Sequence, residues 1–276
     1  MQLEQLIDTF NGRFLGEYES TTPSLSYDGA EVQGRYGNLT IASHLKPIRL
    51  HADPSRISAY DTNPLVFKVS RSPAPGEPPA NGGLTDIVCL DRLGRTVHIL
   101  NYLSLKQTEG YIFLHVHPQH VLAVKQNHGA YFEDIIRLCG LPVSRVVITL
   151  PLNSVYESQE STLLERLKTY RDRGYATAVK FEELAGNNLV LRFRNRYLHT
   201  LTPDFVRFNA GFFHPPYWQD DDPHRYSDWF AEFRAAKVRV MIEQIMHADD
   251  VERMNRIQPD FVNGGWYEDQ YLISRA

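Results

Sequence analysis

An amphipathic helix followed at once by a short apolar strand constrains the fold of this chain more than any other stretch. The helix is marked by apolar residues at helical spacing, which are Leu163, Leu164, Leu167 and Tyr170. Gly174 stands where this helix should end, and the strand that follows reaches Glu183. A helix that leads directly into an apolar strand is half of an α/β unit, so we predict a mostly parallel sheet.

The same alternation of strand and helix patterns extends over most of the 276 residues. The predicted strands are Asn38–Ile48, Pro64–Val69, Tyr111–Val116, Arg145–Leu150, Gly174–Glu183, Phe205–Phe208, Val238–Ile242 and Phe261–Val262. The predicted helices are Gln2–Phe14, Leu84–Leu103, Val121–Cys139, Ser161–Arg173, Asp228–Ala236 and Asp249–Ile257. About eight strands over roughly 240 residues are typical of a (β/α)8 barrel, and an open sheet is the alternative.

The first 37 residues do not fit this alternation. After the first predicted helix the chain is polar, without steady periodicity, up to Gly34. We therefore divide the chain into an N-terminal helical extension, residues 1–37, and a barrel domain, residues 38–276. Within the barrel domain, Ser72–Gly83 is rich in Pro and Gly and predicts a mobile loop, and Gly94 could divide the helix predicted at Leu84–Leu103.

Composition excludes several classes of function. Lys and Arg number 29 against 33 Asp and Glu, a net charge of -4, which gives no electrostatic support for nucleic-acid binding. No apolar run approaches the roughly 20 residues that span a bilayer, and the first residues lack a secretory signal. The spacing of Cys89 and Cys139 is not that of a metal site, so we predict that both are reduced thiols in the core. We expect a soluble, cytoplasmic protein that contacts neither membrane nor nucleic acid.

Ligands of α/β proteins bind at the carboxyl ends of the parallel strands. Lys180, Phe181 and Glu182 lie at the end of the strand that opened this section, so we expect them at the active face.

Eight segments carry motifs in a fixed order. They are Lys46-Pro47-Ile48, Asn63-Pro64-Leu65-Val66-Phe67, His115-Val116-His117-Pro118, Thr149-Leu150-Pro151-Leu152, Lys180-Phe181-Glu182-Glu183, the stretch from Asp204 to Asn209, the stretch from Met241 to His247, and the stretch from Asp260 to Gly264. In this order they resemble the EAL domain, the phosphodiesterase family that hydrolyses cyclic dimeric GMP on a modified TIM barrel. The resemblance covers about Asn38 to Glu268 and implies an EAL-type barrel.

The resemblance also implies which positions would hold the family's two divalent metals. Those positions, with neighbouring pocket positions, read Asn63, Phe67, His115, Thr149, Lys180, Phe181, Asn209, Glu243 and Asn263. Only Glu243 offers a carboxylate, whereas hard divalent cations need several oxygen ligands. The family's phosphate-binding arginine aligns with Phe67. We therefore predict a degenerate domain without metal, cofactor or catalysis, which acts in bacterial signalling through an unknown protein partner.

Two other functions stay open. The domain could be a weak receptor that binds cyclic dimeric GMP without hydrolysing it. The candidate binding residues are Lys46, Lys68, Glu243 and Asn263. A metal-dependent hydrolase is the less favoured alternative, because His115 and His117 resemble the HxH pair of amidohydrolases and Lys180 could bridge metals. Tyr217 and Trp218 lie in an aromatic and acidic loop that is a candidate interface, for a partner or for a homodimer.

Overall fold

The computed structural model describes residues 2–17, 22–68, 84–105, 110–124, 129–182, 187–214 and 230–273. The predicted loop Ser72–Gly83 and the candidate interface residues Tyr217 and Trp218 lie outside the described residues.

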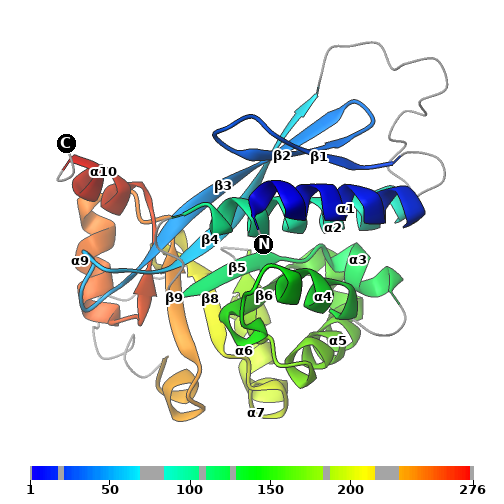
Figure 1. Ribbon diagram of the computed structural model, residues 1–276. Helices are drawn as coiled ribbons and strands as arrows, with labels where there is room; N and C mark the ends of the chain where they lie inside the picture. The colour runs from blue at the N-terminus through cyan, green and yellow to red at the C-terminus, as the bar shows by residue number, and fades with distance from the viewer. Residues whose placement is uncertain are drawn as a thin grey trace.

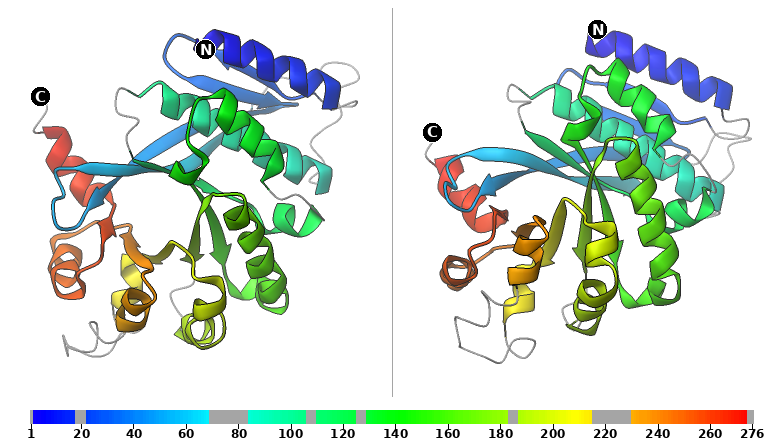
Figure 2. Two further views of the ribbon diagram at one scale, coloured as in Figure 1. Left: turned by 60° about the horizontal axis from the view of Figure 1, so that its bottom comes forward. Right: turned by 90° about the horizontal axis from the view of Figure 1, so that it is seen from below.

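Eight strands close into a barrel with helices around it, as the sequence predicts (Figures 1 and 2). The sheet order is β3-β10-β9-β8-β7-β6-β5-β4, and pairing of β3 with β4 closes the ring. All neighbours from β4 to β10 run parallel, whereas β3 is antiparallel to both β4 and β10. The barrel is therefore a modified TIM barrel with one reversed strand.

In chain order the barrel strands are β3 (Leu39–Leu50), β4 (Ile57–Lys68), β5 (Tyr111–His115), β6 (Val146–Leu152), β7 (Ala176–Phe181), β8 (Phe205–Asn209), β9 (Arg239–Glu243) and β10 (Phe261–Val262). The helices are α1 (Leu3–Glu17), α2 (Leu84–Leu103), α3 (Pro118–Ala123), α4 (Ala130–Leu138), α5 (Glu160–Asp172), α6 (Asn187–Arg196), α7 (Leu198–Leu201), α9 (Ala248–Ile257) and α10 (Gly265–Ile273), with a further helical segment at 230–235. The opening helix ends as expected, since Gly174 follows the C-cap of α5 at φ +90°.

Side chains alternate between two sides of the barrel wall, as the period of a strand requires. On the outer side, Val179, Phe181, Val206 and Phe208 belong to the large core between sheet and helices. On the inner side, one end of the barrel is filled by apolar residues, which we call the lower tier: Ile48, Ala59, Phe113, Val147, Ala176, Ala178, Phe205, Met241 and Phe261. The next inward positions toward the carboxyl ends of the parallel strands are polar.

The N-terminal extension is not only helical. Two strands, β1 (Ser24–Tyr27) and β2 (Val32–Tyr36), follow α1 and continue the sheet, because β2 pairs antiparallel with the outer part of β3. α1 packs on β1, and α2 packs on β2 and β3 (Figure 1). No strand was predicted before Asn38, because alternation over only four or five residues is too short to be recognised.

One further boundary differs from the prediction: β4 begins at Ile57, seven residues before the predicted Pro64. The sequence left one or two helices open over Leu84–Leu103, and α2 is one continuous helix through Gly94. A side chain at Gly94 would meet nothing within 4 Å, so this glycine faces open space beside the helix without interrupting it. The earlier start of β4 brings an acidic residue into the barrel.

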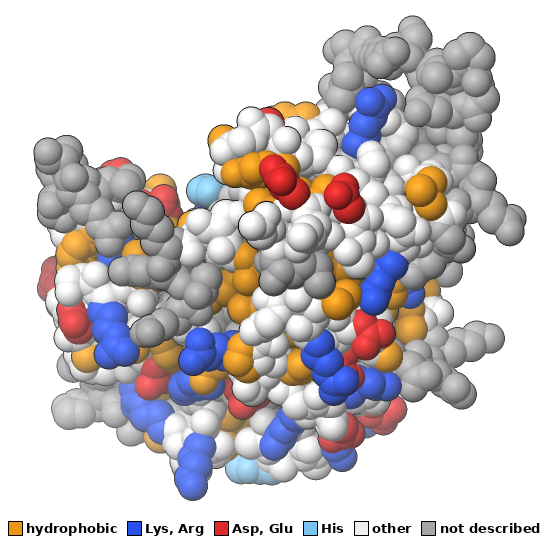
Figure 3. Space-filling view, in the orientation of Figure 1, with side chains coloured by type: hydrophobic (Ala, Val, Ile, Leu, Met, Phe, Trp, Pro, Cys, Tyr) orange, Lys and Arg blue, Asp and Glu red, His pale blue; other side chains and the backbone are white. Residues whose placement is uncertain are grey.

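The described surface carries charges of both signs. On the face shown in Figure 3, Lys and Arg side chains lie among Asp and Glu side chains over the lower half. Among the described residues, no helix is both long and apolar enough to cross a membrane. Cys89 and Cys139 are free thiols, and burial raises the pKa of Cys139 to about 12.

Candidate functional site

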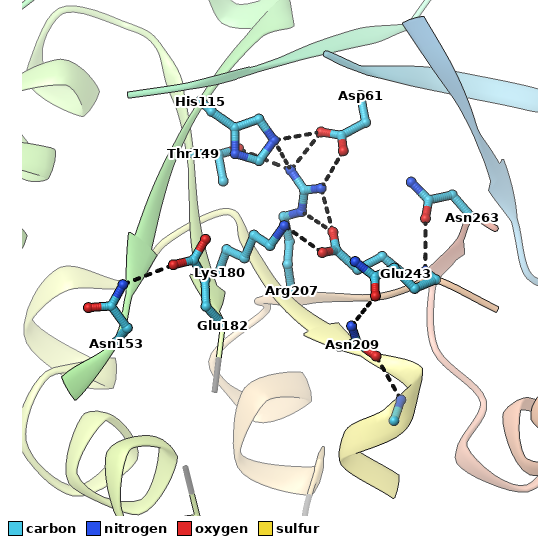
Figure 4. Close-up of polar contacts among 12 residues, drawn as sticks. Asp61, His115, Thr149, Asn153, Lys180, Glu182, Arg207, Asn209, Glu243 and Asn263 are labelled. Carbon is cyan, nitrogen blue, oxygen red and sulfur yellow. Dashed lines mark hydrogen bonds and ion pairs between the residues drawn. The ribbon is translucent and has the colours of Figure 1, made fainter. Parts of the chain in front are cut away.

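Polar side chains from six strands meet inside the barrel, directly above the lower tier. Strand by strand from β4 to β9, this upper tier consists of Asp61, His115, Thr149, Lys180, Arg207 and Glu243 (Figure 4). Each points inward because it stands two residues from a lower-tier position on its strand, as Arg207 does from Phe205. The upper tier thus occupies the end of the barrel where ligands of this architecture bind.

Arg207 is the centre of the upper tier. Its side chain is fully buried, and its Nη1 and Nη2 donate to the two oxygens of Asp61 at 2.8 Å each. Its Nε and Nη2 also donate to Oε2 of Glu243, at 3.2 and 2.5 Å. A guanidinium that bridges two carboxylates in this way uses its fixed fork of donors on both.

Lys180 completes the charge balance. Its Nζ lies 2.7 Å from Oε1 of Glu243, so both oxygens of that carboxylate are taken by cations. Arg207 and Lys180 together carry two positive charges against the two negative charges of Asp61 and Glu243. The upper tier is therefore an internally neutralised network, and burial inside the protein makes each of its bonds stronger than it would be in water.

The pKa values of these groups follow from that network. Burial by itself would raise the pKa of Asp61, but Arg207 and His115 outweigh burial and hold it below its ordinary value. The same balance lowers the pKa of Glu243, with Arg207 and then Lys180 as the main opposing charges. Arg207 itself is held in its charged form because Asp61 and Glu243 overcome the cost of burial. All three groups are ionised at neutral pH.

Two further side chains tie the network to its surroundings. Nε2 of His115 lies 3.1 Å from Oδ1 of Asp61, and Oγ1 of Thr149 accepts from Nη1 of Arg207 at 3.3 Å. Below it, the guanidinium carbon of Arg207 lies 5.2 Å from the centre of the Phe113 ring. Arg207 therefore joins the charged upper tier to the aromatic lower tier.

A pocket of about 380 Å³ opens beside the upper tier. Its walls come from α2, from the outer halves of β3 and β4, and from the ends of β5, β6 and β7. Most of its lining is apolar, including Val66, Val116 and Pro151, and its polar groups include His115 and Glu182. Its size and lining are typical of a site for part of an organic ligand.

The remaining predicted positions are placed differently. Asn209 donates to the side chain of Gln244 and accepts from the backbone of Gly211, and Asn263 accepts from the backbone of Gln244 at 3.3 Å. These contacts hold the loops after β8, β9 and β10 together at the mouth of the barrel (Figure 4). Both asparagines thus shape the rim of the site.

Some predicted pocket residues do not reach the upper tier. The Phe181 ring stacks on Phe208 at 5.0 Å, on the outer side of the barrel wall. Phe67 is 54% exposed on the outer part of β4, and Asn63 lies on the same strand two residues beyond Asp61. The positions aligned with the family's signature Glu-Ala-Leu-x-Arg therefore stand beyond the barrel interior.

The two candidate lysines and the two histidines of the HxH motif do not lie together at one site. Lys46 lies on β3 opposite Asp61 and is half-buried, while the side chain of Lys68 lies outside the described part of the chain. His117 caps α3, where its Nδ1 accepts from the backbone of Gln119, and only His115 joins the upper tier. The HxH pair does not converge on one centre.

Sequence reasoning missed the two residues that matter most, Asp61 and Arg207. The segment from Ile57 to Asp61 alternates Ile, Ala and polar residues, which is a strand signal that was overlooked in favour of Pro64 and beyond. Arg207 stands between Val206 and Phe208, and counting by two from Phe205 would have placed it inside the barrel. Their partnership spans 146 residues of sequence, and no local pattern reports it.

No family model matches the sequence, and no curated protein matches it. Solved structures do match. Klebsiella pneumoniae BlrP1, in a complex with calcium and cyclic di-GMP, has a TM-score of 0.62 and 14% identity over 82% of this chain and 54% of its own. The Bacillus subtilis YkuI protein, with an EAL domain, in complex with cyclic di-GMP and calcium, has a TM-score of 0.61 and 16% identity over 82% of this chain and 53% of its own. The FimX EAL domain from Pseudomonas aeruginosa, bound to cyclic di-GMP, has a TM-score of 0.61 and 13% identity over 82% of this chain and 88% of its own.

The chain has the fold of an EAL domain. It spans about half the length of the BlrP1 and YkuI chains, and identities this low establish the fold alone.

The upper tier does not fit the pair of divalent metals that the EAL family implies. Both oxygens of Asp61 accept from Arg207, and both oxygens of Glu243 contact a cationic side chain. The described residues contain no group of three or more acidic, histidine or cysteine side chains placed to hold a metal ion. Hard cations need several free oxygen ligands, and here a guanidinium stands where such a cation would have to bind.

Proposed function

We propose that this chain is a non-catalytic EAL-fold domain of cyclic dimeric GMP signalling that acts by binding a protein partner. The observation that carries the proposal is the buried guanidinium of Arg207 between Asp61 and Glu243. The solved structures with this fold named above hold cyclic di-GMP, which supports the signalling context.

Arg207 argues against hydrolysis through the cost of displacing it. Metal-assisted hydrolysis needs ions that polarise the phosphate and generate hydroxide from bound water. To bind at Asp61 and Glu243, such an ion would have to remove a guanidinium that is fully buried and then lacks partners. Leaving a buried charge without its partner costs about 3–5 kcal/mol, so the network resists opening.

A receptor that binds cyclic dimeric GMP without hydrolysing it is the second candidate. The 380 Å³ pocket beside the upper tier favours it, because an apolar cleft with a few polar groups suits a planar base. Phosphate attraction is weak there, since Lys180 is paired with Glu243 and Phe67 stands in place of a basic residue. We therefore expect weak binding if the ligand binds.

Titration calorimetry with cyclic dimeric GMP, with and without magnesium or manganese, tests both candidates when the same samples are assayed for the linear dinucleotide. The proposal predicts no product under any condition. Formation of product with either metal would contradict it. Heat of binding without product would select the receptor, and neither heat nor product would direct the search to protein partners.

Gly94 offers a matched variant for the receptor. It lines the pocket from α2, and a side chain there meets nothing within 4 Å, so Gly94→Leu fills the pocket without a clash in the helix. Gly12 in α1 is equally open and distant from the pocket, which makes Gly12→Leu the control. A receptor that uses this pocket loses binding in Gly94→Leu alone.

A further inference from the structure

The outer part of β4, residues 63–68, leaves the barrel and pairs on one side only (Figure 1). Its pairing with β3 continues out to Lys68, which lies opposite Leu39. Its pairing with β5 covers only residues 59–61, so among the described strands none lies against the other side of residues 63–68. In an antiparallel pair every second residue turns its N–H and C=O away from the neighbouring strand. This free edge of β4 therefore offers backbone donors and acceptors to a further strand.

Three consecutive apolar residues on the free edge are exposed to solvent. Leu65, Val66 and Phe67 have 42, 56 and 54% of their surface exposed. Proteins usually protect the edge of a sheet with charges, a proline or a cover, because an open apolar edge attracts another strand. The free edge has Pro64 where β4 leaves the barrel, but the three residues after it carry no charge. They are thus an exposed apolar strand.

The opposite edge of the same sheet, on β1, is covered. There the side chain of Asn11, on α1, accepts from the backbone N–H of Leu25 at 2.7 Å and donates to its C=O at 3.0 Å. One amide side chain thus takes the place of a neighbouring strand on β1. The contrast between the two edges shows that the free edge of β4 is the one available to a partner.

The 380 Å³ pocket beside the upper tier adjoins the free edge. Pro64 and Val66 stand two residues apart on one face of β4, and both line the pocket, as does Ile41, which lies opposite Val66 on β3. A strand added to β4 would therefore direct every second side chain toward this largely apolar pocket. Its other side chains would lie beside Leu65 and Phe67, on the opposite face of the sheet.

The charges at the pocket favour a basic residue in the added strand. Besides three histidines, the ionisable residues that line the pocket are Asp91, Arg95 and Glu182, and the first two form an ion pair. Glu182 is exposed, and its Oε2 accepts from the side-chain amide of Asn153 at 2.9 Å. Within the described part of the chain, no Lys or Arg forms an ion pair with Glu182. An exposed carboxylate at the pocket is complementary to Lys or Arg.

We propose that an extended segment of the protein partner adds to the free edge of β4 as a further strand. It places an apolar side chain in the pocket and a Lys or Arg beside Glu182. This inference rests on the proposed function, because it names the surface through which the partner binds. Backbone hydrogen bonds along β4 supply affinity, and the pocket and Glu182 select the sequence.

Random peptides displayed on phage and selected on the full chain are the probe. The proposal predicts enriched peptides that carry an apolar stretch and a Lys or Arg. When such a peptide binds, hydrogen exchange of the backbone amides of residues 63–68 should slow, because their outward N–H groups become hydrogen-bonded. Failure to enrich any peptide would overturn the proposal, and so would bound peptides that leave this exchange unchanged.

Four variants locate the binding of the enriched peptides by fluorescence anisotropy. Val66→Lys puts a charge on the free edge, and Gly94→Leu fills the pocket from α2, so each should weaken binding by about tenfold or more. Glu182→Gln removes one exposed charge and should weaken binding about threefold. Leu15→Lys, at an exposed position of α1, is the control and should bind as the unsubstituted chain does.

The remaining outcomes separate this surface from the proposed function. Peptides that bind Val66→Lys and Gly94→Leu as well as the unsubstituted chain would overturn the β4 surface and leave partner binding elsewhere in place. A dimer in sedimentation velocity whose β4 amides are protected without peptide would make a second copy of the chain the occupant and would also overturn the proposal. Hydrolysis of cyclic dimeric GMP would contradict the proposed function, whatever the peptides do.

Discussion

The two tiers of the barrel interior lie directly above one another, yet they are built in opposite ways. The lower tier packs aromatic rings edge to face, with Phe205 at 4.9 Å from Phe113 and 5.4 Å from Tyr111. The upper tier holds four charged groups that balance in pairs. The first keeps its stability whatever the pH, whereas the second depends on every partner staying charged and in place.

The comparison teaches where the chain retains the architecture and where its chemistry differs. The lower tier needs only volume and shape, which many apolar residues supply. The upper tier occupies the end at which such barrels carry function, and there a guanidinium takes the oxygens that a metal site would need. This difference is the basis of our proposal that the domain acts through its surface.

The largest expected effect comes from breaking the centre of the upper tier. Arg207→Met keeps an unbranched apolar stem but removes the guanidinium, which leaves Asp61 and Glu243 buried with too few cations, so unfolding should become easier by about 3–5 kcal/mol at pH 7. Without the arginine, burial raises the pKa of Asp61, and protonation then removes the buried charge. The loss measured by urea unfolding should therefore shrink as the pH falls toward about 4.

A matched control is Arg256→Met, which removes an exposed ion pair with Glu252 on α9. It should change the free energy of unfolding by less than about 1 kcal/mol. A loss of similar size in both variants would show that the upper tier contributes no more than a surface pair.

The second prediction separates the upper tier from another source of pH dependence. His98 on α2 is buried beside Ser43, and burial lowers its pKa to about 3. The unfolded chain binds a proton there below about pH 6.5 while the folded chain does not, so His98 lowers stability as the pH falls. Between pH 7 and 5 this loss is about 2 kcal/mol, and His98→Gln should remove most of it.

The upper-tier carboxylates respond at lower pH, because their pKa values in the folded protein lie below their ordinary values, 3.8 for Asp61 and 4.5 for Glu243. Their contribution is present above those ordinary values and is lost as the pH falls below them. Urea unfolding of His98→Gln should consequently show a smaller loss of stability from pH 7 to 5 than the unsubstituted chain, and a steep fall below about pH 4. The loss that remains between pH 7 and 5 comes from His51 and His120, whose pKa values burial also lowers. A profile unchanged from the unsubstituted chain would assign the acid response to other groups.

A smaller effect is expected in the lower tier. Phe205→Leu replaces a ring that contacts Tyr111, Phe113 and Phe261 with a smaller aliphatic side chain. It should lower the free energy of unfolding by about 1.5 kcal/mol through lost packing. The guanidinium of Arg239 lies 3.8 Å from the centre of the Phe205 ring and stays charged at both pH values, so this cost should be the same at pH 7 and pH 5. A cost that varies with pH would show that the two tiers are coupled through the contact of Arg207 with Phe113.

The smallest effect should come from Lys180→Met. The lysine side chain is 19% exposed and water screens part of its interaction, and Arg207 still holds Glu243 after the change. We expect a loss of about 1 kcal/mol by urea unfolding. A loss as large as that of Arg207→Met would make Lys180, and not Arg207, the main cation of the tier.

The sequence predicted the barrel because eight strand patterns alternate with amphipathic helices, and this signal is local. It placed Lys180 in the site because this residue lies near the end of a strand with clear boundaries, and it placed Glu243 there through the resemblance to the EAL family. It missed Asp61 because β4 begins earlier than its most apolar part, and it assigned the signature positions two residues away on Asn63. The pairing of Asp61 with Arg207 follows from closure of the barrel, which no local pattern encodes.

The most direct test of the account is a titration of the purified chain with manganese followed by electron paramagnetic resonance. Since Arg207 and Lys180 engage the carboxylates of Asp61 and Glu243, the account predicts that the manganese stays free in solution at concentrations up to a millimolar excess. One or two tightly bound equivalents of manganese that are lost in Glu243→Gln would contradict the account and would favour a metal-dependent phosphodiesterase.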